Sequence, residues 1–194
     1  MFKNLANKLT LSRIIVIPVI LAFMLVPLVI PFVWAARWAA WIALLLYTYA
    51  CVTDWLDGYL ARRNNTITKV GQFLDPIADK LLVAAIILVL VYSKQSTILN
   101  TLLILLPALV ILMREITVSG LREFLANTEV SVPVSRLAKW KTAIQMVALG
   151  FLIIGDYAPY GIPATIIGII GLWIAAIFTI ITAWDYWKAS VKHF

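Results

Sequence analysis

Two segments, D-W-L-D-G-Y-L-A-R at residues 54–62 and G-Q-F-L-D-P-I-A-D at residues 71–79, decide the fold of this chain and indicate its chemistry. They place four carboxylates at the ends of two stretches that are otherwise apolar enough to cross a bilayer. Asp54 and Asp57 are three residues apart, and Asp75 and Asp79 four, so each pair shares one face of a helix. At membrane depth these charges repel one another and lose hydration, so the cluster needs compensating positive charge.

Divalent cations would supply that charge. Carboxylate oxygens are hard ligands that suit Mg²⁺ or Mn²⁺, and two such ions about 4 Å apart can clamp a reacting phosphoryl group. The sequence therefore predicts two divalent cations, Mg²⁺ or Mn²⁺, with Asp54, Asp57, Asp75 and Asp79 as ligands. The alternative is a set of interfacial carboxylates that form salt bridges with Arg62, Arg63, Lys69 and Lys80.

Small residues between the carboxylates favour the cation site over simple salt bridges. Gly58, Ala61 and Gly71 would let a bulky ligand approach the helix backbone beside the metals.

The composition predicts an all-α integral membrane protein with a single domain at residues 1–194. Hydrophobic residues make up 63% of the chain and charged residues only 13%, which a soluble domain could not accommodate. Six apolar stretches are long enough to cross the hydrocarbon as helices. We expect six transmembrane helices near 12–30, 34–62, 70–92, 98–126, 137–155 and 164–187. An amphipathic helix at residues 1–11 is expected to lie on the membrane surface before them.

The distribution of positive charge predicts the orientation in the membrane. Of sixteen Lys and Arg, only Arg37 and Lys94 fall in loops predicted on the far side. By the positive-inside rule, both termini and the carboxylate cluster face the cytoplasm, which places the chain in the cytoplasmic (inner) membrane. The net charge of +7 therefore indicates topology and anionic lipid headgroups, and we expect no nucleic-acid partner. With one cysteine and one terminal histidine, zinc chemistry and histidine-dependent nucleophilic catalysis are not expected.

A second polar cluster falls on the same predicted leaflet. Arg114 and Arg122 are eight residues apart, about 80° around a helix, so they flank one broad face. Lys139 and Lys141 follow at the start of the next apolar stretch. These four cations could form a phosphate pocket, for which forked guanidinium groups are suited. Ordinary positive-inside charge, with Arg114–Glu115 and Arg122–Glu123 surface pairs, is the open alternative.

The pattern D-x-x-D-G-x-x-A-R, eight residues, then G-x-x-x-D-x-x-x-D resembles the signature of the CDP-alcohol phosphotransferases, and every fixed position is filled. The runs L-T-L-S-R at 9–13, R-E-I-T-V-S-G-L-R-E at 114–123 and K-W-K-T at 139–142 resemble the branch of that family that makes phosphatidylglycerophosphate. The resemblance implies transfer of a phosphatidyl group from CDP-diacylglycerol to glycerol 3-phosphate, with release of CMP. It also implies a homodimer.

The resemblance assigns roles to individual residues. Asp54, Asp57 and Asp75 would hold the metals, and Asp79, also a possible ligand, would be the catalytic base. The expected sites for CDP-diacylglycerol are Gly58, Ala61, Arg62 and Gly71, and those for glycerol 3-phosphate are Arg114, Arg122, Lys139 and Lys141. Thr10 and Arg13 are additional candidates.

Two kinds of alternative function stay open. The same chemistry could use another acceptor: inositol phosphate, serine or a phosphatidyl lipid such as phosphatidylglycerol. A divalent-cation or proton-coupled transporter could also be lined by four aspartates, but it should carry carboxylates near mid-membrane and paired broken helices. Here the acidic residues lie at one interface and the sequence has no duplicated halves.

Overall fold

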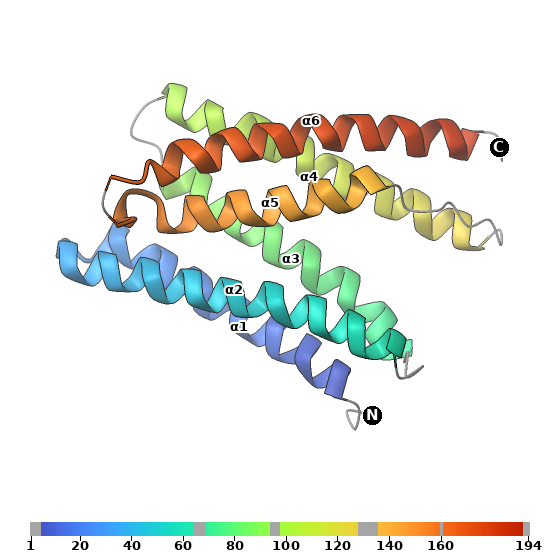
Figure 1. The fold of residues 1–194 in the computed structure, drawn as a ribbon, viewed down its shortest axis with the longest axis horizontal. Coiled ribbons are helices and arrows are strands. Elements are labelled where there is room, and N and C mark those ends of the chain that lie inside the picture. The colour runs from blue at the N-terminus through green and yellow to red at the C-terminus, as the bar shows by residue number, and fades with distance from the viewer. Residues whose placement is uncertain (1–4, 64–68, 94–97, 128–135, 160, 192–194) are drawn as a thin grey trace.

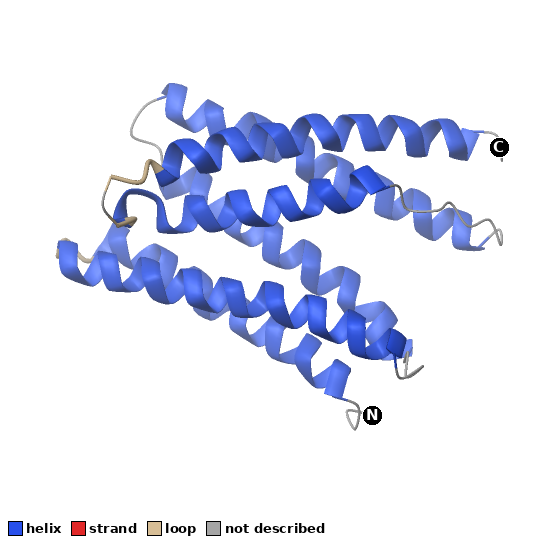
Figure 2. Cartoon of the chain, in the orientation of Figure 1, coloured by secondary structure: helices blue, strands red, loops and turns tan. Residues whose placement is uncertain are grey.

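The computed structural model describes residues 5–63, 69–93, 98–127, 136–159 and 161–191, which fold into helices without a strand (Figure 2). The helices are α1 (Leu5–Val29), α2 (Val33–Arg63), α3 (Lys69–Ser93), α4 (Ile98–Asn127), α5 (Arg136–Ile154), the short 3-10 helix η1 (Gly155–Tyr157) and α6 (Ala164–Val191). The all-α fold class predicted from the sequence is confirmed.

Four segments are long and apolar enough to cross a membrane: Leu9–Val29, Val33–Leu56, Thr101–Leu121 and Ala164–Lys188. They support the prediction of a membrane protein, while the number of six spans stays a prediction. The outward surface agrees with lipid as the solvent, because large apolar side chains such as Val29, Trp34 and Ile98 are more than two-thirds exposed.

The first helix differs from the prediction. The sequence suggested a surface helix at residues 1–11 and a separate span at 12–30, whereas α1 runs without interruption from Leu5 to Val29. No glycine or proline lies between Leu5 and Val16, so nothing in that part of the sequence ends a helix. The predicted boundary at residue 11 is therefore wrong. The position of the first turns on the membrane surface remains a prediction.

The helices form two groups that α3 joins. In Figure 1, α1 lies beside α2 and α5 lies beside α6, while α4 crosses behind α6. Helix α6 packs against both α4 and α5. Helix α3 crosses the molecule and packs against α1, α4 and α5. Fully buried side chains from several helices meet in one core, among them Ile20, Ile86, Leu149 and Leu172. Both chain ends lie toward the same end of the molecule (Figure 1).

Helices α5 and α6 approach closely because glycine replaces a side chain at their contact. A Cβ atom at Gly168 would lie 2.6 Å from Cγ of Leu152 and 3.0 Å from the carbonyl oxygen of Ala148. A Cβ atom at Gly171 would lie 2.9 Å from Cβ of Ala148. Small residues at helix contacts are a common device for close packing in membranes.

Candidate active site

The carboxylates predicted to share a site come from two helices and meet against a third. Asp54 lies in the C-terminal third of α2, and Asp75 and Asp79 lie in the first half of α3. Helix α1 packs against both α2 and α3. Spacing along the chain places Asp75 and Asp79 on one face of α3, and packing on α1 brings Asp54 and Asp79 to the same arginine.

Two polar residues of α1 contact these carboxylates. Thr10 Oγ1 donates a hydrogen bond to Asp75 Oδ1 at 2.7 Å. Arg13 Nη1 donates to Asp54 Oδ1 at 2.5 Å and to Asp79 Oδ1 at 3.2 Å. Both α1 side chains are buried. The two residues that the sequence offered only as additional candidates thus connect three of the predicted site carboxylates.

The carboxylates present are of the donor type that divalent cations prefer. One nitrogen of Arg13 lies within hydrogen-bonding reach of oxygens from Asp54 and Asp79, so those two oxygens are close enough to share a positive charge. The carboxylate side chains of Asp54 and Asp79 stay 36% and 45% exposed, which leaves oxygen atoms open to ligands from solution. Among the described side chains, no three acidic, cysteine or histidine residues converge on one point, but the side chain of Asp57 is outside that set.

Of the salt bridges proposed as the alternative, the described side chains allow only the one from Lys80 to be compared. Lys80, the nearest lysine in sequence to Asp79, donates its hydrogen bond to Ser119 on α4. The observed cationic partner of Asp54 and Asp79 is Arg13, from a helix that the alternative did not consider. Arg62, Arg63 and Lys69 have side chains outside the described residues.

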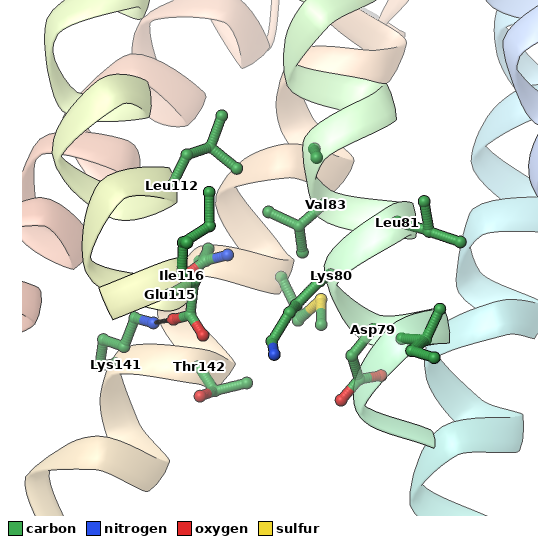
Figure 3. A pocket seen from close by; sticks show the side chains of 13 residues that line it. Asp79, Lys80, Leu81, Val83, Leu112, Glu115, Ile116, Lys141 and Thr142 are labelled. Carbon is green, nitrogen blue, oxygen red and sulfur yellow. Dashed lines mark hydrogen bonds and ion pairs between the residues drawn. The ribbon is translucent and has the colours of Figure 1, made fainter. Parts of the chain in front are cut away.

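A cavity of about 380 Å³ opens beside Asp79, between α3, α4 and α5. In Figure 3, the Lys80 side chain lies between Asp79 and the ion pair of Glu115 and Lys141. Most of the lining is apolar, and its polar groups are the cations Lys80 and Lys141, the carboxylates Asp79 and Glu115, and the neutral Thr142 and Gln145. The cavity therefore holds charged and hydrogen-bonding groups within an apolar lining next to Asp79.

Lys141 and Glu115 form an ion pair in this cavity (Figure 3). Lys141 is buried, with 3% of its side chain exposed, so pairing is required to offset the loss of hydration. Arg114 Nη1 contacts the same Glu115 oxygen at 3.4 Å, and its Nη2 contacts Thr182 Oγ1 of α6 at 3.5 Å. The Arg114–Glu115 pair expected if these charges serve topology alone is therefore present.

Three of the four cations predicted to bind phosphate have described side chains, and the structure separates them. Lys141 lines the cavity beside Asp79. Arg114 is turned toward α6 and lines a different, apolar cavity between α4 and α6. Lys139 is exposed, and its position two residues before Lys141, about 200° around α5, places it on the other side of the helix. The side chain of Arg122 lies outside the described residues.

Most residues predicted to bind the nucleotide lipid lie at the C-terminal end of α2. Gly58, Ala61 and Arg62 are there, as is the predicted metal ligand Asp57, and their side chains are outside the described residues. Gly71 lies in α3 one turn before Asp75, and its role stays a prediction.

The sequence analysis missed Glu115, Lys80, Thr142 and Gln145 as lining residues of the cavity. Two of them carried a usable signal. Gln145 is a polar residue inside an apolar stretch, one turn after Lys141 and therefore on the same helix face. Thr142 belongs to the K-W-K-T run that we had noted for its lysines. Lys80 was considered only as a partner of the aspartates.

Fold and site together define a helical membrane protein with carboxylates beside a cavity that holds both charged and apolar groups. The family model for CDP-alcohol phosphatidyltransferases matches residues 3–181 of the chain, which includes every residue of the site. The chain belongs to this family.

The chain is also similar over nearly its whole length to named members of the family. It is 47% identical over 192 residues to the CDP-diacylglycerol–glycerol-3-phosphate 3-phosphatidyltransferase of Rickettsia felis, covering 99% of this chain and 98% of that protein. It is 41% identical to the enzyme of the same name from Salmonella choleraesuis, covering 96% and 94%. Identity to the Bacillus subtilis enzyme of that name is 36%, covering 96% and 95%.

Proposed function

We propose that this protein transfers the phosphatidyl group of CDP-diacylglycerol to glycerol 3-phosphate and releases CMP. The observation that carries the proposal is the position of Asp79, which shares Arg13 with Asp54 and also lines the cavity that contains Lys141. A group that activates an acceptor hydroxyl must be able to reach both the acceptor and the reacting phosphorus. The relatives named above carry the same activity in their names.

Divalent cations, Mg²⁺ or Mn²⁺, are proposed at the carboxylate cluster, with Asp54, Asp57, Asp75 and Asp79 as the residues that would hold two of them. When bound, they neutralise the diphosphate of the substrate and stabilise the departing CMP. Gly58, Ala61, Arg62 and Gly71 are proposed to accommodate the nucleotide part of CDP-diacylglycerol, and the acyl chains would remain in the membrane.

The proposed step is a displacement at the phosphorus that carries the diacylglycerol. Asp79 accepts the proton of an acceptor hydroxyl while that oxygen forms a bond to the phosphorus. The bridging P–O bond of the diphosphate breaks, and CMP leaves with its electron pair. Lys141 is proposed to bind the phosphate of glycerol 3-phosphate in the cavity, so that the hydroxyl is held near Asp79. Arg114, Arg122 and Lys139 remain proposed contributors of positive charge on the same side.

The proposed location is the cytoplasmic membrane, with the site and both termini toward the cytoplasm, where glycerol 3-phosphate and CMP are soluble. A homodimer is proposed from the family resemblance alone.

The test uses purified protein in detergent micelles with CDP-diacylglycerol, Mg²⁺ and a panel of acceptors, scoring CMP release. We expect release with glycerol 3-phosphate and little with serine, inositol phosphate or phosphatidylglycerol. The variant Asp75→Asn serves as the inactive control. Preference for another acceptor would overturn the proposed substrate and leave the aspartate chemistry intact. If CMP is released with none of the acceptors, the proposed transferase activity is wrong and the cation transporter is favoured.

A further inference from the structure

Arg13 is a charged residue in an unusual position. It lies within the apolar segment Leu9–Val29 of α1, and none of its side chain is exposed. A buried guanidinium is unfavourable unless anions and hydrogen-bond acceptors compensate for lost hydration. Asp54 and Asp79 provide both, through the same Arg13 nitrogen.

Arg13 connects α2 and α3, the two helices that contribute the carboxylates of the proposed active site. Among the described residues, α2 and α3 each pack more extensively against α1 than against each other. Thr10, three residues before Arg13 and on the same face of α1, adds the hydrogen bond to Asp75. The relative position of the α2 and α3 carboxylates therefore depends on this face of α1.

Arg13 approaches the carboxylates from inside the protein, and solution reaches them from the other side. The guanidinium is fully buried, whereas the side chains of Asp54 and Asp79 remain about two-fifths exposed. Arg13 contacts one oxygen of each carboxylate, and the rest of both side chains is partly open to solution. Arg13 thus leaves room at Asp54 and Asp79 for cations that arrive from solution.

We infer that Arg13 is the built-in cation of this cluster, a positioning residue that holds Asp54 and Asp79 together until divalent cations bind and then shares these carboxylates with them. The inference rests on the proposed divalent-cation requirement. Arg13 and the bound cations then have the same stabilising effect, because both reduce the electrostatic repulsion between the same carboxylates. Their effects on stability must be coupled with opposite sign, so that each matters less when the other is present.

The experiment measures the thermal unfolding temperature of purified wild type and Arg13→Gln, each in chelator and in saturating Mn²⁺. We expect Arg13→Gln to be clearly less stable in chelator and to recover most of the difference in Mn²⁺. The apparent Kd for Mn²⁺, measured by electron paramagnetic resonance of free Mn²⁺, should fall about 5-fold or more in Arg13→Gln. Arg13→Lys, which keeps the charge, should lie between the two proteins in both measurements and supplies a second variant if Arg13→Gln does not fold in chelator.

The matched control is Arg114→Gln, which removes another largely buried arginine whose described contacts are with Glu115 and Thr182. Its difference from wild type should be the same in chelator and in Mn²⁺. If the Arg13→Gln difference is also independent of Mn²⁺, or if this variant binds Mn²⁺ more weakly than wild type, the inference is overturned. CMP release by the wild type decides the proposed function separately, because it does not depend on these stability differences.

Discussion

Lys141 and Lys139 are two residues apart on α5, yet only Lys141 faces the cavity that contains Asp79. We expect Lys141→Met to raise KM for glycerol 3-phosphate, because the variant loses a charged hydrogen-bond donor to the acceptor phosphate. Such a bond contributes roughly 1.5–3 kcal/mol, or about 10- to 150-fold in KM. KM for CDP-diacylglycerol should change much less. Steady-state kinetics with each substrate varied in turn measure both values.

Lys188→Met is the control for this substitution. Lys188 is an exposed lysine that lies over the ring of Trp184 on α6 and is not part of the cavity. Its loss should leave both KM values near those of the wild type. If the two variants behave alike, the lysines serve topology only. Lys139→Met, measured in the same series, tests whether the exposed lysine also contributes to acceptor binding.

Asp54 and Asp79 both contact Arg13, but we expect their substitution to change the kinetics in different ways. Asp54→Asn removes an anionic ligand, so activity should be lost and should not return at high Mg²⁺ or Mn²⁺. Asp79→Asn should lower kcat by about 10²-fold or more, the range of general-base contributions, with KM for CDP-diacylglycerol largely kept. Chelator should silence the wild type, and added Mg²⁺ or Mn²⁺ should restore it. Equal loss of nucleotide-lipid binding in both variants would make Asp79 another ligand and exclude it as the base.

At the scale of residues, the sequence predicted which side chains share a helix face but not which helices would meet. The spacing of Asp75 and Asp79 follows from helical geometry, so it could be read directly. The contacts of Arg13 and the separation of Arg114 from Lys141 depend on packing between helices distant in sequence. The sequence alone does not contain that packing, so four cations predicted at the same leaflet were interpreted as a single phosphate-binding pocket.

At the scale of elements, the close contact between α5 and α6 gives a test of packing. Gly168→Ala would place a methyl group within 3.0 Å of Leu152 and against the backbone of Ala148, so the two helices must separate. We expect a loss of stability of about 1–3 kcal/mol, typical of overpacking. Thermal unfolding of purified protein, followed by size-exclusion chromatography, measures the change.

Gly120→Ala is the matched control. Gly120 lies in α4, and a Cβ atom there would meet nothing within 4 Å. Alanine is the better helix former by up to about 1 kcal/mol, so this variant should be as stable as the wild type or more stable. A comparable loss in both variants would show that the α5–α6 contact can relax and that glycine is not needed there.

Helix positions followed from the sequence more reliably than helix ends. The predicted segments 34–62 and 98–126 agree with α2 and α4 within one residue at each end, because long apolar stretches and polar turns mark them clearly. The predicted break at residue 11 failed because a change from amphipathic to apolar sequence alters the surroundings of a helix without ending it.

At the scale of the whole molecule, charge and fold give a consistent orientation. Arg13, Asp79 and Lys141 lie in the N-terminal halves of α1, α3 and α5, and Asp54 lies in the C-terminal third of α2. The short turn after η1, which includes Gly161 with a φ of 70°, joins α5 and α6 at their other ends. One side of the protein is therefore basic and carries the site, and the other side has few charges.

This orientation can be tested with single cysteines. Cys51 is the only native cysteine, so Cys51→Ser provides a background without thiols. We expect Ile162→Cys, in the exposed turn before α6, to react with a membrane-impermeant maleimide added to intact spheroplasts. Lys139→Cys, at the exposed start of α5, should react only after lysis, because the positive-inside rule keeps that end in the cytoplasm. The reverse pattern would place the site outside, away from a cytoplasmic pool of glycerol 3-phosphate, and would contradict both the orientation and the proposed acceptor.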